Sequence, residues 1–291
     1  MGRRSYVLTE AKFELSVPSS SLDASSPVCE GRREVPIISS LPTDTLTIGG
    51  LPIARLTRSE LAQLMLADVA RARTGEMKCP RLITSANGSV VAAYHQNPVL
   101  RHALDNMDLI DADGMPLVFA SRLFCKRPLL ERAATTDFLL DACAAAVPEG
   151  VRFYFLGARP GVAARAAEYL RYRYPSLQVV GTRNGYFKHQ DLPQICQHIR
   201  EVGTDVLWLG LGTPRQEQIA VEARDMLQGT AWIRTCGGLF DHYGGGVSRA
   251  PQWMQVAGLE WLYRGAREPL RLGWRYLVTN PVAVYHLMTK T

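Results

Sequence analysis

Two carboxylates stand two residues apart in the stretch DADG, residues 111–114. A short apolar run (LIDA) leads into them and a helix-like stretch (MPLVFASRLF) follows, so they lie where a strand ends. Asp113 then has two interpretations: it caps the following helix, or it is a general base that takes a proton from an attacking hydroxyl group. Asp111 would face the same side of a regular strand, and two close carboxylates raise the pKa of one of them. DADG alone leaves both interpretations open.

The stretches SAN and GARPG also follow strand-like runs. Ser85 and Asn87 could cap the next helix, or they could hold a sugar hydroxyl group as neutral donors. Neither interpretation is favoured by these residues alone. Gly157 opens a strand–turn–helix segment whose N-terminal amides could bind an anion.

The stretch GLGTPRQE turns through Gly212 and Pro214 into a polar, helix-like segment. It does not match the dinucleotide fingerprint GxGxxG, because Arg215 stands where Gly or Ala is needed, and no Walker A loop occurs in the chain. Gln216 and Glu217 could be first-turn helix residues, since the helix macrodipole favours Glu there. Their amide and carboxylate could instead recognise the edge of a base or a ribose.

A glycine-rich stretch, CGGLFDHYGGG, ends the next apolar run and contains Asp241 and His242, with Arg249 shortly after it. Successive glycines are entropically costly, and they are tolerated best where a backbone approaches a ligand or a loop moves. One His and one Asp do not form a metal site, and the six cysteines show no metal-ligand spacing. No metal and no cofactor are therefore predicted.

Residues 249–291 carry six basic side chains against two acidic ones. Apolar residues recur there at steps of three or four, and arginines recur beside them at the same spacing: Arg264, Arg267, Arg271 and Arg275. This pattern predicts a basic amphipathic helix with interfacial Trp and Tyr, suited to an anionic membrane surface. A helix packed on the core with a solvated basic face is the alternative.

The elements that position these residues alternate along the chain. Strand-like runs at 81–86, 109–112, 151–157, 205–211 and 231–238 are separated by helix-like runs at 88–107, 115–124, 160–174 and 214–228. Such alternation predicts an α/β, Rossmann-like fold with a largely parallel sheet and helices on both faces. Ligands of such sheets bind outside the carboxyl ends of the strands. All five polar stretches fall there, so we expect them along one rim.

Composition divides the chain into three parts. Residues 1–44 are rich in Ser and Pro and are predicted to be a disordered leader, residues 45–248 are the α/β core, and residues 249–291 are the basic helical C-terminal appendage. No apolar run approaches the ~20 residues that span a bilayer, and no apolar segment follows the N-terminal arginines as in a secretory signal. We expect a cytoplasmic protein, peripheral at the inner face of the membrane.

Taken together, these stretches resemble the WecG/TagA/CpsF family of bacterial glycosyltransferases. The likeness runs from about residue 45 to about residue 280 and includes SAN, ADG, ER…TD, FLGARPG, VVGTRNGYF, GLGTPRQE, GGLFD…GG…RAP and GLEWLYR…EPLR, in order. The resemblance implies an inverting, metal-independent transferase. Asp111-Ala-Asp113 also has the spacing of a DxD pattern that binds Mg²⁺ in many transferases, so a metal-dependent reaction is the alternative. The enzyme would move a sugar from a UDP-sugar to a saccharide on a polyprenyl-diphosphate carrier, in the assembly of a surface polysaccharide. A homo-oligomer is compatible with this assignment.

The resemblance also implies roles for individual residues. Asp113 corresponds to the general base, and Ser85 and Asn87 correspond to the polar pair of the same pocket, where the family often has Thr at the first position. The turn of Pro214, Gln216 and Glu217 is similar to the nucleotide-binding element. The appendage would dock on the membrane and its arginines would neutralise the diphosphate. The further substrate-binding positions are Asp111, Gly114, Arg132, Asp137, Gly157, Gly212, Asp241, Arg249, Arg264, Arg267 and Arg271.

One segment departs from the family pattern: RVxGxD is replaced by ERAATTD, so Thr135 adds a Cβ where Gly is usual. Three other functions also fit parts of the sequence. A nicotinamide-dependent oxidoreductase fits the sheet but lacks the glycine fingerprint. A non-catalytic, lipid-binding scaffold fits the basic appendage but leaves the polar rim unused. Binding of nucleic acid is not predicted, because no recognised module is present.

Overall fold

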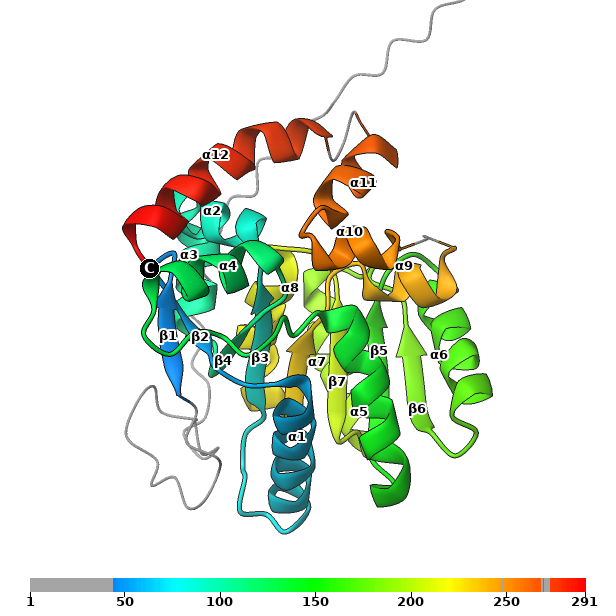
Figure 1. The fold of residues 1–291 in the computed structure, drawn as a ribbon. Helices are drawn as coiled ribbons and strands as arrows, with labels where there is room; N and C mark the ends of the chain where they lie inside the picture. The colour runs from blue at the N-terminus through cyan, green and yellow to red at the C-terminus, as the bar shows by residue number, and fades with distance from the viewer. Residues whose placement is uncertain (1–43, 247–248, 268, 270–272) are drawn as a thin grey trace, which may run out of the picture. The chain divides into compact units, whose positions relative to one another are not determined.

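The computed structural model describes residues 44–246, 249–267, 269 and 273–291; apart from Asp44, the predicted leader lies outside these residues. Six strands form one parallel sheet in the order β4-β3-β8-β7-β5-β6 (Figure 1). The strands are β3 (Arg81–Ala86), β4 (Leu109–Ala112), β5 (Arg152–Gly157), β6 (Gln178–Arg183), β7 (Val206–Gly210) and β8 (Trp232–Thr235). The predicted α/β fold with a parallel sheet is confirmed.

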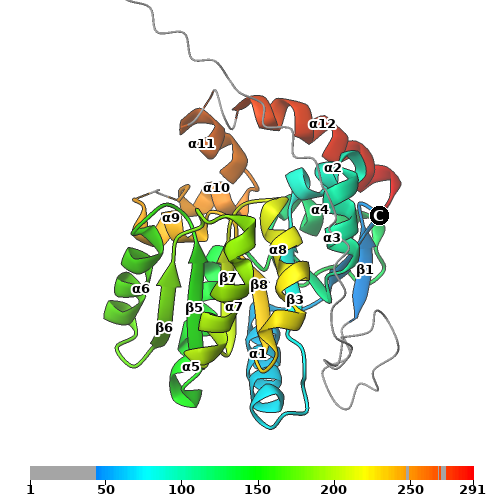
Figure 2. The ribbon, with the colours of Figure 1, turned by 180° about the vertical axis from the view of Figure 1, so that it is seen from behind.

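Helices cover both faces of this sheet, as Figures 1 and 2 show from opposite sides. One face carries α1 (Arg58–Arg73), α5 (Thr135–Glu149), α6 (Val162–Arg173) and the short α9 (Leu239–Gly244). The core on the other face includes α2 (Gly88–Gln96), α3 (Pro98–Asp105), α4 (Met115–Phe124), α7 (Leu192–Glu201) and α8 (Arg215–Ala223). It also includes an antiparallel hairpin of β1 (Thr45–Ile48) and β2 (Leu51–Ala54).

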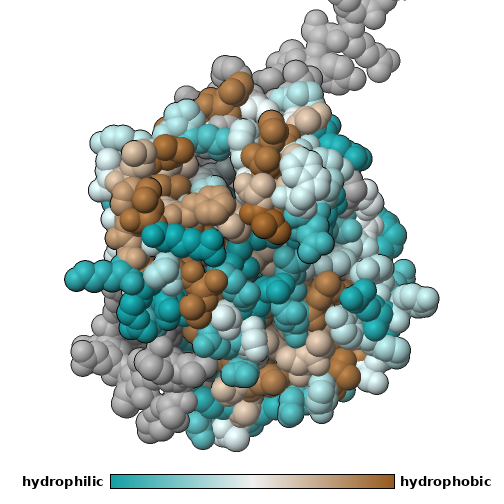
Figure 3. Space-filling view, in the orientation of Figure 1, coloured by the Kyte–Doolittle hydropathy of each residue, from teal (hydrophilic) through white to brown (hydrophobic). Residues whose placement is uncertain are grey.

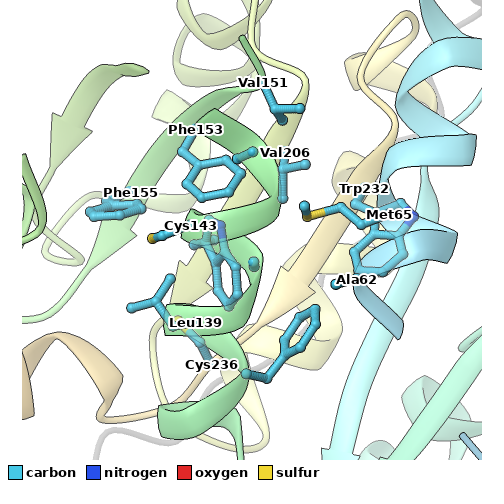
Figure 4. Packing of buried hydrophobic residues seen from close by; sticks show 14 of the residues in the cluster. Ala62, Met65, Leu139, Cys143, Val151, Phe153, Phe155, Val206, Trp232 and Cys236 are labelled. Atoms are coloured by element: carbon cyan, nitrogen blue, oxygen red, sulfur yellow. The ribbon is translucent and has the colours of Figure 1, made fainter. Parts of the chain in front are cut away.

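Alternating side chains of the strands divide the core between the two faces. Phe153 and Phe155 of β5 pack with α5 and α6, whereas Tyr154 and Leu156 belong to the opposite core. Figure 4 shows Phe153 close to Cys143 of α5, in the part of the core that packs with α1, α5 and α6. Because successive strand residues point to opposite faces, a strand buried on both sides must be apolar throughout. This accounts for the run FYFLG at residues 153–157, which carries no charged residue.

Two parts of the core differ from the predicted elements. The helix predicted over residues 88–107 is two helices, because Pro98 begins α3 and Asn97 caps it through its side chain. A proline disfavours the helical conformation of the residue before it, so the break falls at Asn97. Strand β6 and helix α7 were not predicted; β6 is a partly exposed edge strand with a glycine inside it, which weakens its pattern.

The C-terminal appendage contains α10 (Gln252–Val256), α11 (Glu260–Arg267) and α12 (Trp274–Thr289). Figures 1 and 2 show these helices above the carboxyl ends of the strands. Helix α12 packs on α2, where Ala283 and Leu287 are buried. Beyond α12, the Lys290 carbonyl accepts a hydrogen bond from Gly50 N at 2.9 Å. Among the described residues, no helix has the length and apolar character to cross a bilayer.

Asp68 of α1 connects the helix layer to the sheet. Its carboxylate is fully buried and accepts hydrogen bonds from Arg81 Nε at 2.6 Å and from Trp232 Nε1 at 2.8 Å. Removing one partner of a buried ion pair leaves the other charge without compensation. We expect Asp68→Ala to lower the free energy of unfolding by about 3–5 kcal/mol, measured by urea denaturation. The same change at exposed Asp105 should cost less than about 1 kcal/mol, and equal losses would contradict this interpretation.

Candidate active site

The polar stretches of the sequence meet at one rim of the sheet. Ser85 lies beside Asp111 in the parallel register of β3 and β4, at the carboxyl ends of both strands. Gly157 lies beside Gly210 in β5 and β7, and Thr235 closes β8 immediately before the glycine-rich stretch. Because all these strands run in the same direction, the expected common rim is present.

Asp113 lies just beyond β4, and it does not cap α4. The N-cap of α4 is Gly114, which makes no side-chain capping bond, so the capping interpretation of Asp113 is wrong. The half-buried carboxylate of Asp113 instead accepts a hydrogen bond from Thr135 N, at the start of α5, at 3.3 Å. Its own backbone N–H donates to Ala86 O at 2.8 Å. The side chain is therefore held between two strand ends and the N-terminus of α5.

Burial is the main cause that raises the pKa of Asp113 to about 7, and the neighbouring Asp111 carboxylate raises it further. Glu260 acts in the same direction, whereas Arg132 and Arg234 oppose the shift. A carboxyl group with a pKa near 7 can exchange protons at neutral pH. Asp113 therefore has the properties of a general acid or base.

A buried polar cluster of Arg234, Asp111, Ser85 and Thr135 lies next to Asp113. Arg234 of β8 has no exposed surface, and its Nη2 lies 2.7 Å from Asp111 Oδ2. The same nitrogen donates to Ser85 Oγ at 2.8 Å. The Ser85 hydroxyl in turn shares a 2.8 Å hydrogen bond with Thr135 Oγ1. Burial raises the pKa of Asp111, and the positive charge of Arg234 opposes this.

Asn87 and Gly114 are the N-cap residues of α2 and α4, the two helices that begin at this part of the rim. Asn87 caps α2, because its Oδ1 accepts a hydrogen bond from Val90 N at 3.2 Å. Gly114 packs against Asn87, and a Cβ at position 114 would meet Asn87 Cα at 3.3 Å. Since that spacing is tight, glycine lets the DADG and SAN stretches come together.

Charged side chains from the core and the appendage meet beside this cluster. Asp137 pairs with Arg132 at 3.4 Å and forms a short ion pair with Arg249. Arg132 also pairs with Glu260 of α11, Nη1 to Oε2, at 3.1 Å. Burial opposes ionisation of Asp137, yet its arginine partners hold its pKa below the usual value. The predicted residues Arg132, Asp137 and Arg249 therefore lie together, joined to Glu260.

The GLGTPRQE turn places its polar side chains inside the protein. Gln216 is buried and accepts a hydrogen bond from Gly237 N at 2.9 Å, which ties this turn to the glycine-rich stretch. Glu217 is 2% exposed, and its Oε1 accepts hydrogen bonds from Gln216 and Thr213. Burial raises the pKa of Glu217. Pro214 follows a cis peptide bond at the N-cap of α8.

The remaining predicted positions lie around the same rim or in the appendage. Gly157 packs so closely on Gly210 that a Cβ would meet its carbonyl oxygen at 2.1 Å, and Gly212 has a φ of +79°. Asp241 lies in the first turn of α9. Arg267 of α11 donates to the hydroxyl group of Tyr263 at 3.1 Å. Of Arg264 the structure describes the backbone in α11, and Arg271 lies outside the described residues.

Two site residues were not predicted from the sequence: Arg234 and Glu260. Arg234 stands inside the apolar run AWIRTCGG, and a charged residue within a buried strand is almost always paired. That rule could have directed attention to it, although it names no partner. Glu260 gave no such signal, because its contact with Arg132 spans 128 positions of sequence.

A parallel α/β sheet with a carboxylate of raised pKa and an arginine cluster at its carboxyl rim is an arrangement that can bind an anionic ligand and transfer a proton. The family comparison agrees: residues 46–291 match the model of the Glycosyl transferase WecG/TagA/CpsF family. The chain belongs to this family and is a glycosyltransferase. This membership argues against the alternatives of an oxidoreductase and a non-catalytic scaffold.

Proposed function

We propose that this protein transfers a sugar from a UDP-sugar to a polyprenyl-diphosphate-linked saccharide in the assembly of a bacterial surface polysaccharide, with inversion at the anomeric carbon. The observation that carries the proposal is the half-buried Asp113 carboxylate, whose pKa is raised to about 7 by burial. Inversion requires one base that deprotonates the acceptor hydroxyl group as the sugar bond forms. Asp113 is the residue for that step.

The arginines beside Asp113 support binding of the donor diphosphate. Arg132 holds the Glu260 carboxylate at 3.1 Å, and Arg249 holds Asp137. A guanidinium group that binds a carboxylate also suits a phosphate, since both present paired oxygens. The diphosphate would take the place of Glu260 on Arg132. Arg264, Arg267 and Arg271 of the appendage would add charge that stabilises the departing UDP.

The same geometry favours a reaction without a divalent metal. Asp111 and Asp113 have the spacing of a metal-binding DxD pattern, but Asp111 is 1% exposed and lies against Arg234. Its carboxylate is therefore occupied by a guanidinium group rather than directed at the rim. Among the described residues, no group of three His, Cys, Asp or Glu side chains could hold a metal ion. Arginine charge would take over the stabilisation of the leaving diphosphate.

Exposed apolar side chains support a peripheral position on an anionic membrane, at the cytoplasmic face. Figure 3 shows hydrophobic residues gathered over the upper part of the molecule, where Figure 1 places α4, α11 and α12. The exposed members include Phe119, Leu123, Phe124, Trp261, Leu262, Leu277, Val278, Tyr285 and Met288. Apolar groups beside basic ones bind an anionic lipid surface. This surface would deliver the lipid-linked acceptor to Asp113.

The decisive experiment is a panel of UDP-sugars tested against polyprenyl-diphosphate-linked mono- and disaccharides, with and without EDTA. We expect release of UDP with at least one pair, at a rate that EDTA leaves unchanged, and a product of inverted anomeric configuration by NMR. No UDP release from any pair would overturn the proposed reaction. A rate abolished by EDTA and restored by Mg²⁺ would overturn the metal-free mechanism alone.

A further inference from the structure

The buried pair of Asp111 and Arg234 has no evident structural purpose. A buried ion pair is weak evidence for stability, because the cost of desolvation offsets the attraction. In the part of the chain that the structure describes, both carboxylate oxygens of Asp111 and the Nε and Nη1 atoms of Arg234 have no hydrogen-bond partner. Such unsatisfied buried groups are rare and call for an explanation. Stability does not supply one here.

The position of Arg234 suggests an explanation. Its Nη2 contacts both Asp111 Oδ2 and Ser85 Oγ, at 2.7 and 2.8 Å. The Ser85 hydroxyl bonds Thr135 Oγ1, and the backbone N–H of Thr135 donates to the Asp113 carboxylate. The ring of Phe138 lies against the guanidinium group, 5.5 Å from Cζ to the ring centroid. A continuous set of contacts therefore runs from Arg234 to Asp113.

We propose that Arg234 is a positioning residue for Asp113, acting through Asp111, Ser85 and Thr135 to fix the place and the charge state of the base. The inference rests on the proposed function, in which Asp113 is that base. Ser85 and Thr135 bond to each other through their hydroxyl groups. The network thus joins three strand ends to the start of α5.

The charge state of Asp113 depends on every charged group that faces it. These are Asp111 of β4, Arg234 of β8, Arg132 before α5 and Glu260 of α11. Asp111 raises the pKa of Asp113, and Arg234 lowers it. Asp111→Asn removes the negative neighbour and leaves the positive one, so Asp113 becomes easier to ionise. A base active in its ionised form then works at lower pH.

The first test compares the pH dependence of kcat/KM in the wild type and Asp111→Asn. We expect the acid limb to move down by about one pH unit. The ¹³C carboxyl shift of Asp113, titrated by NMR without substrate, should move by the same amount. An unmoved NMR titration would overturn the inference. If the wild type shows no transfer with any donor–acceptor pair, the proposed function fails, while the NMR titration still decides the role of Asp111.

The second test removes the pair as a unit, because Asp111→Asn alone leaves Arg234 as an unpaired buried charge that could unfold the protein. Arg234→Met/Asp111→Leu should keep the wild-type melting temperature, because replacing both members with apolar groups of similar size is tolerated. We expect kcat to fall about 10²-fold from misplacement of the base, with the Kd for UDP changed less than twofold. Arg234→Lys, which keeps the charge, should recover part of kcat. Wild-type kcat in the double variant would overturn a positioning role.

Discussion

Replacing Asp113 with asparagine is expected to lower kcat for sugar transfer by about 10²–10⁴-fold, the usual contribution of a general base. Asparagine keeps an oxygen that can accept the hydrogen bond from Thr135 N, which is 3.3 Å from the Asp113 carboxylate. The fold and the arginines proposed to bind UDP should therefore be unaffected. Single-turnover kinetics would measure the chemical step, and calorimetry would show a Kd for UDP within about twofold of wild type.

The control for this prediction is Asp225→Asn, the same change at an exposed position of the 3₁₀ turn Asp225–Leu227. That variant should transfer sugar at the wild-type rate. Wild-type kcat in Asp113→Asn would assign the base to another residue. A loss of both kcat and UDP binding would instead place Asp113 in donor binding.

The second large effect is expected from the appendage arginines. Replacing Arg264, Arg267 and Arg271 with glutamine should lower kcat/KM by at least about 10²-fold, because each charge-assisted hydrogen bond to the diphosphate contributes about 1.5–3 kcal/mol. The same variant should lose binding to vesicles that contain anionic phosphatidylglycerol, measured by co-sedimentation. Helix α12 should remain folded on the core, so the melting temperature should change little.

A second triple variant controls for the loss of charge alone. It places glutamine at three exposed basic residues of the core: Lys78, Lys188 and Arg200. This variant loses as many charges and should keep both transfer and vesicle binding. Equal losses in the two triple variants would mean that only net charge matters. Deleting residues 249–291 is a poorer test, because Ala283 and Leu287 are buried and the shortened core would be destabilised.

Much of the fold could be predicted because parallel strands buried on both faces have a strong pattern. The runs FYFLG at residues 153–157 and VLWLGL at residues 206–211 carry no charged residue, and each is followed by a turn with glycine or polar residues. The carboxyl ends of parallel strands share one edge of the sheet. The position of the polar stretches after these strands therefore predicted that they would lie along one rim. Strand β6 was missed because its burial alternates weakly at the edge of the sheet.

The candidate site was predicted less completely, because its contacts join residues far apart in the sequence. Asp113 looked like a helix cap from its neighbours, but the hydrogen bond that holds it comes from Thr135, 22 residues away. Arg234 is 149 residues from Ser85. Local patterns report periodicity and capping, whereas the pairing of two buried charges depends on which strands become neighbours.

The appendage is attached to the core on both sides of its central arginines. Arg249 is bound to Asp137 at one side, and at the other Gly49 N donates to Thr291 Oγ1 at 3.0 Å. A segment that is fixed at both ends has fewer conformations available. Its middle therefore loses less entropy when it becomes ordered. In the proposed function, the arginines of this segment therefore lose less conformational freedom when they bind the diphosphate. Part of the entropic cost of capturing a diphosphate would then be met during folding.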